Sequence, residues 1–191
     1  MSKINNMISG FLNKIGHFSE EELTFLKEEL EFRTLKKDEI LLDKNEVCAF
    51  LSFIISGALY QYKIDSELNK NVIDLNVAND WIINHKSFTT QKPSEYIIQS
   101  YEESTICLLT IDSIHRLIAK SQSFLKLGKV LEASISRIDF FDNNNTPDEK
   151  YQYILKNKSE IIQKFPQKLI ASYLKITPET LSRVRNRFSK L

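Results

Sequence analysis

The order of apolar and polar residues divides the chain into a short helical segment, a long stretch of strand-like runs and a helical last part. Ser19 followed by three glutamates predicts a helix start, because serine caps a first turn well and acidic side chains suit the positive end of the helix dipole. Apolar residues then recur at helical spacing up to Leu30. A helix is therefore expected near the start of the chain.

From residue 32 to residue 111 the apolar residues gather in short runs rich in Val, Ile, Phe, Tyr and Leu. Polar clusters separate these runs at 43–46, 65–70, 77–80 and 89–94. Short strands at such spacing are typical of an antiparallel roll or barrel. Ser56-Gly57 predicts a tight hairpin between two of the runs, with the glycine at a positive φ.

The helical period returns after Thr110 and is most regular between residues 121 and 142, where side chains recur in alternating steps of three and four. This heptad pattern predicts a helix with an apolar seam that needs a partner surface. The partner is either the roll of the same chain or a second copy, and we favour a homodimer. The expected interface residues are Phe124, Leu127, Leu131, Ile138 and Phe141.

Three consecutive asparagines and Pro147 follow this helix and predict a hinge. Three parts result: a sensor roll over residues 1–120, a dimerisation helix over 121–142 and a DNA-binding unit over 143–191. In the last part, residues 148–165 predict one helix, which Pro166 ends.

Charge is unevenly distributed along the chain. From Tyr151 to Leu191 there are nine basic and two acidic residues, a net charge of +7, whereas the rest of the chain carries −6. A basic end on an acidic body favours contact with a polyanion such as DNA. A solvated pair of basic helices is the alternative that charge alone leaves open.

Residues 167–185 fit a helix-turn-helix. Two closely crossing helices need a small residue where they approach, and Ala171 supplies it. The apolar residues expected to fill the corner are Leu174, Ile176, Leu181 and Val184. Thr177 can cap the second helix, and Pro178 takes its first position, where a missing N–H has no cost. Lys175 stands where such turns usually have glycine and is expected in the left-handed conformation.

A spacing of 100° per residue turns Leu181, Val184 and Phe188 toward the core and leaves a polar face outward. On such a face a glutamate can accept a hydrogen bond from cytosine, and an arginine can grip guanine through two bonds. Arg185 and Arg187 flank this face, where phosphates would run. The predicted DNA contacts are Thr177, Glu179, Ser182, Arg183, Arg185, Asn186, Arg187 and Lys190.

Nearly the whole chain resembles a Crp/Fnr-type transcriptional regulator. The similarity lies in the ISGALYQY segment (Ile55–Tyr62), the long helix and the ITPETLSRVR segment (Ile176–Arg185), which looks most like the compact versions in Bacteroidetes-type bacteria. The resemblance implies an α+β fold. An N-terminal helix pair and an antiparallel, cyclic-nucleotide-binding-like or cupin-like β-roll would precede a long dimerisation helix and a C-terminal helix-turn-helix domain.

The resemblance also implies roles for particular residues. In the family's cyclic-AMP receptor protein a glutamate and an arginine four residues later read the bases, and they align with Glu179 and Arg183. Pro178 replaces an arginine of that receptor, so the base preference is expected to differ. The implied partners are double-stranded DNA with a palindromic site, a second copy of the chain and RNA polymerase, with no membrane.

The family's nucleotide pocket holds the phosphate with an arginine and the ribose with a glutamate. The aligned positions here have Ser94 and Asn84, and Glu95 follows Ser94. A carboxylate at this place would repel a phosphate, so we expect no cyclic AMP and no other cofactor. An unidentified effector would contact Trp81, Asn84, Ser87 and Ser94.

Other features limit the compartment and the chemistry. The two cysteines form no spaced cluster, which disfavours disulfides, iron–sulfur clusters and metal sites. The apolar runs are too short for a membrane span, and the N-terminus lacks a signal-peptide core, so a cytoplasmic location is expected.

Two other functional classes stay open. A dimerisation or protein-interaction scaffold with a vestigial DNA-binding end would have no use for Arg183, Asn186 and Lys190 on one face. An enzyme of the cupin-like kind would need a His/Glu metal set or a glycine-rich loop. Three scattered histidines and four glycines disfavour the enzyme.

Overall fold

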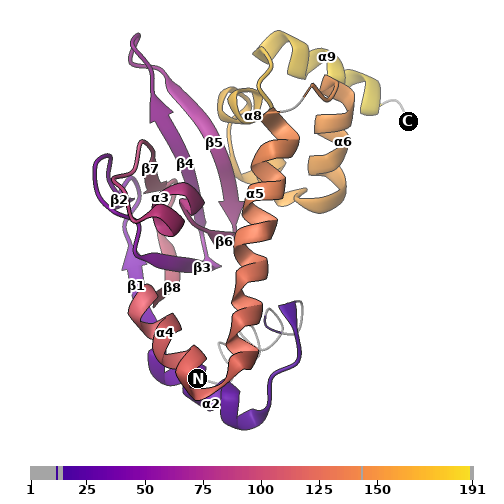
Figure 1. Ribbon diagram of the computed structural model, residues 1–191. Helices are drawn as coiled ribbons and strands as arrows, with labels where there is room; N and C mark the ends of the chain where they lie inside the picture. Colours follow the sequence, from indigo (N-terminus) through magenta and orange to yellow (C-terminus); the bar gives the residue numbers. More distant parts are fainter. Residues whose placement is uncertain (1–11, 13–14, 143, 190–191) are drawn as a thin grey trace.

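The computed structural model describes residues 12, 15–142 and 144–189, and Figure 1 shows a β-roll joined by a long helix to a group of C-terminal helices. This is the α+β fold that the sequence predicts. The strands are β1 (Glu31–Leu35), β2 (Ile40–Leu42), β3 (Phe50–Ser56), β4 (Ala58–Ile64), β5 (Lys70–Val77), β6 (Trp81–Ile82), β7 (Ile97–Ser100) and β8 (Ser104–Thr110). The helices are α2 (Glu20–Glu29), α3 (His85–Thr90), α4 (Ile111–Lys120), the 3₁₀ segment η1 (Gln122–Leu127), α5 (Gly128–Asp142), α6 (Pro147–Asn157), α7 (Glu160–Lys164), α8 (Gln167–Tyr173) and α9 (Pro178–Phe188).

Two four-stranded antiparallel sheets form the roll, in the orders β1-β8-β3-β6 and β2-β7-β4-β5. Because β3 and β4 lie in different sheets, Ser56-Gly57 passes the chain from one sheet to the other, and the predicted hairpin is wrong. The positive φ of Gly57 is confirmed at 94°, and a Cβ there would come within 2.2 Å of the Ser104 hydroxyl oxygen. Strand β5 ends its sheet, so one edge of its backbone is open to contacts from outside the sheet.

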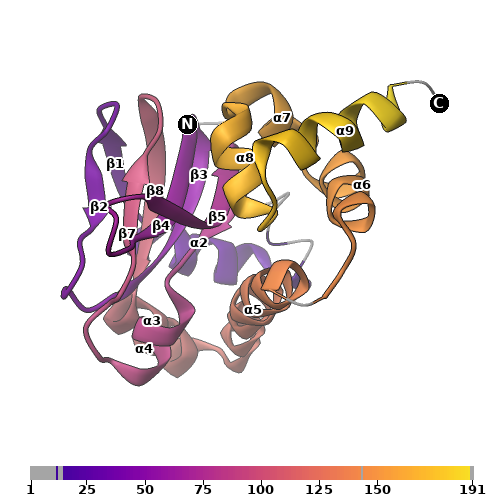
Figure 2. The same cartoon turned by 90° about the horizontal axis from the view of Figure 1, so that it is seen from above.

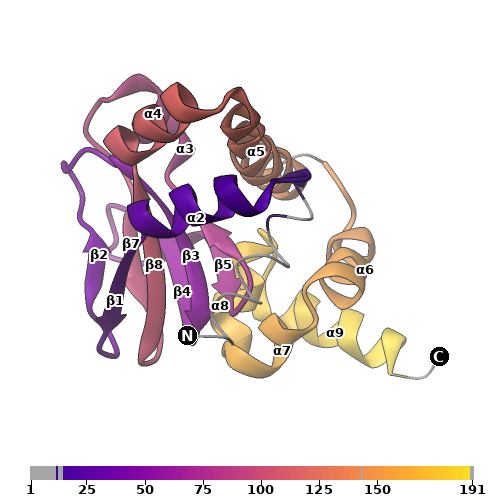
Figure 3. The ribbon, with the colours of Figure 1, turned by 90° about the horizontal axis from the view of Figure 1, so that it is seen from below.

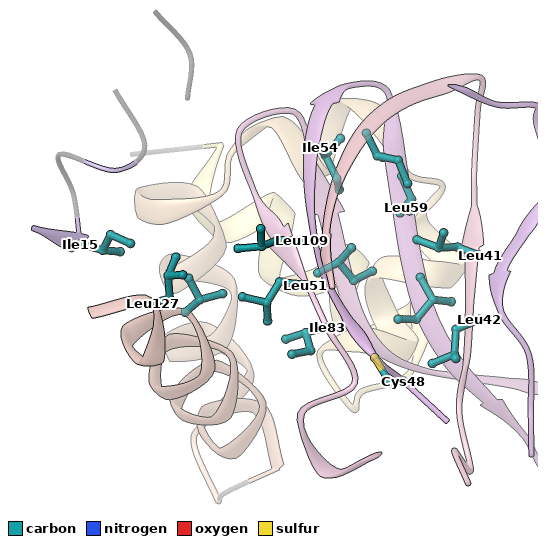
Figure 4. Close-up of a cluster of buried hydrophobic side chains, with 14 of the residues drawn as sticks. Ile15, Leu41, Leu42, Cys48, Leu51, Ile54, Leu59, Ile83, Leu109 and Leu127 are labelled. Atoms are coloured by element: carbon teal, nitrogen blue, oxygen red, sulfur yellow. The ribbon is translucent and has the colours of Figure 1, made fainter. Parts of the chain in front are cut away.

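Buried aliphatic side chains fill the space between the two sheets (Figure 4). Leu51 and Leu109 of the first sheet and Leu59 of the second belong to this cluster, and Leu127 of η1 joins it. Burial of one such side chain contributes about 1.5–3 kcal/mol. Figure 3 shows α2 and α4 across one end of the roll, where they extend the same core.

The helix start predicted at Ser19 is confirmed. The Ser19 hydroxyl accepts the backbone N–H of Glu22, and the Glu22 carboxylate accepts the backbone N–H of Ser19 in return. This helix would be the second of the expected N-terminal pair, and the first falls largely outside the described residues. The short helix α3 inside the strand region was not predicted; the Asn84 side chain caps it.

Two predicted helices differ from the structure. The 121–142 helix begins as η1, because in a 3₁₀ turn residues three apart point the same way and Phe124 and Leu127 both enter the roll core. The 148–165 helix is divided into α6 and α7. Lys158 leaves helical geometry between them and donates a hydrogen bond to the Leu75 carbonyl, 2.9 Å away.

A second apolar cluster joins the roll to the C-terminal helices. It includes Tyr60 and Val72 of the roll, Phe141 of α5, and Ile170 and Tyr173 of α8. Figure 2 shows α8 directly beside β5. The predicted domain boundary at residue 143 is therefore crossed by one continuous core. None of the helices in the described residues is both long and apolar enough to span a membrane.

Candidate nucleic-acid interface

Helices α8 and α9 form the helix-turn-helix. Ala171, Leu174, Leu181 and Val184 are all buried where the two helices meet, as predicted. The backbone N–H of Ile176 donates to the Ala171 carbonyl at 3.0 Å and closes the turn between the helices. The small residue and the apolar corner thus hold α9 against α8.

The start of α9 is built as the sequence predicts. The Thr177 hydroxyl accepts the backbone N–H of Thr180 at 3.2 Å, and Pro178 occupies the first helical position. Lys175 has a φ of 57°, which confirms the left-handed turn. Its ammonium group donates to the Val72 carbonyl of β5 at 2.9 Å, a contact that sequence reasoning did not foresee.

One face of α9 is open to solvent. The four residues exposed on it are Glu179, Ser182, Arg183 and Asn186. Hydrogen bonds from its own backbone N–H and from the Thr177 hydroxyl, with the nearby charge of Arg183, lower the pKa of the Glu179 carboxyl. The face therefore presents an ionised acceptor and a guanidinium donor one helical turn apart, and half-buried Arg185 lies beside them.

Arg187 points at α6, where its Nε lies 3.2 Å from Oδ1 of Asp148 and its terminal nitrogen contacts the same oxygen. This exposed ion pair connects α9 to α6, and the assignment of Arg187 to a phosphate stays a prediction. Lys190 lies outside the described residues.

The structure adds residues that the sequence analysis missed. A groove of about 480 Å³ runs between α6 and α9 beside the open face. Gln167, at the first position of α8, lines it together with Ser182 and Arg185. The signal in the sequence was the helix start after Pro166, which places Gln167 at an exposed helix end.

The predicted effector residues do not form one site. Asn84, Ser87 and Ser94 line a cavity of about 350 Å³, whereas Trp81 lines other cavities and packs on Phe53 with ring centroids 5.3 Å apart. The inclusion of Trp81 is therefore wrong, because β6 carries it toward α5 and away from α3.

The polar side chains of that cavity bond to one another and to backbone. Asn84 Nδ2 lies 2.5 Å from Ser94 Oγ, which donates to the Tyr96 carbonyl, and the Ser87 hydroxyl donates to the Lys92 carbonyl. Glu95, by contrast, is exposed and lies 3.3 Å from the Lys86 ammonium. The three buried residues thus brace the loop around α3.

The predicted dimer seam is largely internal. Phe124 and Leu127 are buried in the roll core, Phe141 is buried in the second cluster, and Ile138 is buried as well. Leu131 is partly buried and packs against the roll. Side chains already buried inside the chain cannot also line an intersubunit seam, so the assignment of the four buried residues to the interface is wrong. The assignment of half-buried Leu131 stays a prediction. The alternative, a helix packed on the roll of its own chain, describes them.

Comparison with known proteins supports the fold. No family model and no curated protein matches the sequence. Solved structures do match: FixK2 from Bradyrhizobium japonicum has a TM-score of 0.68 at 15% identity, covering 84% of this chain and 85% of that chain. A CooA variant from Carboxydothermus hydrogenoformans has a TM-score of 0.61 at 20% identity, covering 87% and 79%. The catabolite activator protein of Thermus thermophilus has a TM-score of 0.57 at 12% identity, covering 91% and 84%.

These neighbours are regulators of the Crp/Fnr family. The chain therefore has the fold of a Crp/Fnr-type regulator, as the sequence resemblance implied. At these identities the comparison defines the fold, and the function rests on the site.

Proposed function

We propose that this chain is a DNA-binding transcriptional regulator that reads the major groove with α9. The observation that carries the proposal is a capped, well-packed second helix of a helix-turn-helix whose open face holds Glu179, Ser182, Arg183 and Asn186. The fold of its structural neighbours and the +7 charge of residues 151–191 support it. Such a helix fits the major groove of B-DNA in width.

Each side chain of the open face has a proposed part. Glu179 accepts a hydrogen bond from a cytosine amine, and Arg183 forks onto a guanine. Thr177, Ser182 and Asn186 stand beside them for further contacts to bases or sugars. Arg185, on the flank, meets a phosphate.

The regulator is proposed to act as a homodimer on a palindromic site, because a two-fold axis presents two copies of α9 to two half-sites. With the seam residues internal, the surface for the second copy is the outward side of α5. Ile135 is 37% exposed there, and Leu125, in the preceding η1, is 61% exposed. RNA polymerase is the proposed partner at the promoter, and the cytoplasm the proposed location.

Cyclic nucleotides are not the proposed effector. The cavity at α3 has a buried, bonded serine where a phosphate-binding arginine would stand, and the carboxylate of Glu95 beside it. Lys86 and Lys92 also line this cavity, but Lys86 is paired with Glu95, and among the described residues no arginine lines the cavity to grip a phosphate through two bonds.

Selection from random double-stranded DNA, with the purified chain at several salt concentrations, tests the proposal. A palindromic sequence should be enriched, and the logarithm of the binding constant should fall linearly with the logarithm of salt concentration. Failure to enrich any sequence at low salt would contradict it.

A further inference from the structure

The open edge of β5 is held by side chains of the C-terminal helices. The backbone N–H of Val72 donates to the Ser172 hydroxyl of α8 at 2.9 Å, and the Val72 carbonyl accepts from the Lys175 ammonium at 2.9 Å. Three residues further along, the Leu75 carbonyl accepts from the Lys158 ammonium at 2.9 Å. We call these contacts of Ser172, Lys175 and Lys158 with β5 the β5 clasp.

The hydrogen bond to the Val72 carbonyl accounts for a lysine at position 175. A glycine would adopt its left-handed backbone conformation without strain, so a lysine is disfavoured by local geometry. Its side chain, however, reaches an edge carbonyl that no neighbouring strand can satisfy, and a buried carbonyl without a partner is costly. The strained residue in the turn of the helix-turn-helix is thus the one that reaches the roll.

Lys158 sits in a larger charged group. Its ammonium also lies 3.1 Å from Asn76 Oδ1 and 3.0 Å from Asp80 Oδ2, and burial lowers its pKa. Around the clasp, Tyr101 of the roll packs on Phe165 with ring centroids 4.9 Å apart, and Lys164 lies 2.6 Å from Glu102. Polar and apolar contacts therefore fasten the same two parts of the chain.

We infer that the β5 clasp fixes the DNA-binding unit on the roll and that Ser172 and Lys175 are positioning residues for α9. Neither side chain belongs to the open face of α9. Their part is to set the direction in which that face points, and hence the distance between two copies of α9 in a dimer. The inference about α9 rests on the proposed function, whereas the clasp itself does not.

Hydrogen exchange of the Val72 amide in the full chain tests the clasp. The double variant Ser172→Ala/Lys175→Gly removes both contacts while glycine keeps the turn unstrained, and Lys168→Ala, an exposed lysine of α8, is the control. Val72 should exchange about tenfold faster in the double variant, and at the wild-type rate in the control, because local opening governs exchange at a strand edge. An unchanged Val72 rate in the double variant would overturn the clasp.

DNA binding tests the positioning. On the selected palindrome, lengthening the spacer by about two base pairs should weaken wild-type binding about tenfold or more, because half-site spacing must match the dimer. The double variant should lose most of that penalty and keep the base preference within each half-site. An equal spacing penalty in both proteins would overturn the positioning role. If the wild type bound no DNA, the proposed function would fail, and Val72 exchange would still decide the clasp.

Discussion

Arg137 of α5 forks onto Asp74 of β5. Its Nε lies 2.9 Å from Oδ1, and its terminal nitrogen bonds Oδ2 and lies 3.4 Å from Asn76 Oδ1. Asp74 is 1% exposed. Burial alone would raise the pKa of this carboxyl, but the charges of Arg137 and Lys158 together hold its pKa below the usual value. The pair is thus ionised inside the protein and links the long helix to the strand that the β5 clasp also holds.

Replacing Asp74 with asparagine should destabilise the fold strongly. The substitution leaves the Arg137 guanidinium buried without its counter-charge, which costs about 3–5 kcal/mol of the free energy of unfolding. Urea unfolding followed by circular dichroism measures it. The matched control is Asp74→Leu/Arg137→Met, which removes both charges and should return to within about 1 kcal/mol of wild type. Equal losses in the single and double variants would contradict the expected role of the pair.

The same pair predicts an acid dependence of stability. The folded pKa of Asp74 is below its unfolded value of about 3.9, so the stabilisation is complete above that pH and is lost as pH falls toward the folded pKa. Below about pH 4 the wild type should therefore lose unfolding free energy more steeply than Asp74→Leu/Arg137→Met does. Parallel curves for the two proteins from pH 5 to pH 2 would refute the assignment.

Two isoleucines of α5 should separate dimerisation from folding. Ile135 is exposed on the outward side, whereas Ile138 is buried. Ile135→Asp should turn a dimer into a folded monomer in sedimentation, with an unchanged circular dichroism spectrum. Ile138→Asp should lower the unfolding free energy, because it buries an unpaired charge. A wild type that sediments as a monomer at micromolar concentration would remove the basis of the dimer proposal.

Calorimetry with cyclic AMP and cyclic GMP at millimolar concentration tests the cavity at α3. No saturable heat is expected, because Ser94 is buried in its own hydrogen bonds and no arginine in the described part of the chain lines the cavity to grip a phosphate. A dissociation constant in the low micromolar range, about −8 kcal/mol, would show that the cavity accepts a nucleotide after all.

Features fixed by near neighbours could be predicted from the sequence. The cap formed by Thr177 and Pro178, the capping box at Ser19 and the positive φ of Gly57 depend on residues at most three positions away. The buried corner of the helix-turn-helix also followed from local periodicity, because Leu181 and Val184 lie one helical turn apart.

Features that depend on distant partners could not be predicted. A heptad seam has the same appearance whether a second copy or the roll covers it, so the burial of Ile138 within its own chain was not determined by the pattern. The sequence pattern placed Arg187 beside the outward face of α9. It did not indicate the ion pair with Asp148, because that residue lies 39 positions earlier in the chain. Likewise, no local pattern joins Lys175 to Val72, 103 residues away.

Binding of the selected DNA by wild type and by two arginine variants tests the central claim most directly. Arg183 is on the open face of α9, whereas Arg187, on the same helix, pairs with Asp148. We predict that Arg183→Ala costs about 1–3 kcal/mol per half-site and relaxes the preference at one base position, because it removes a forked base contact. Arg187→Ala should leave the selected sequence unchanged. An Arg183→Ala protein with wild-type affinity and wild-type sequence preference would contradict the account.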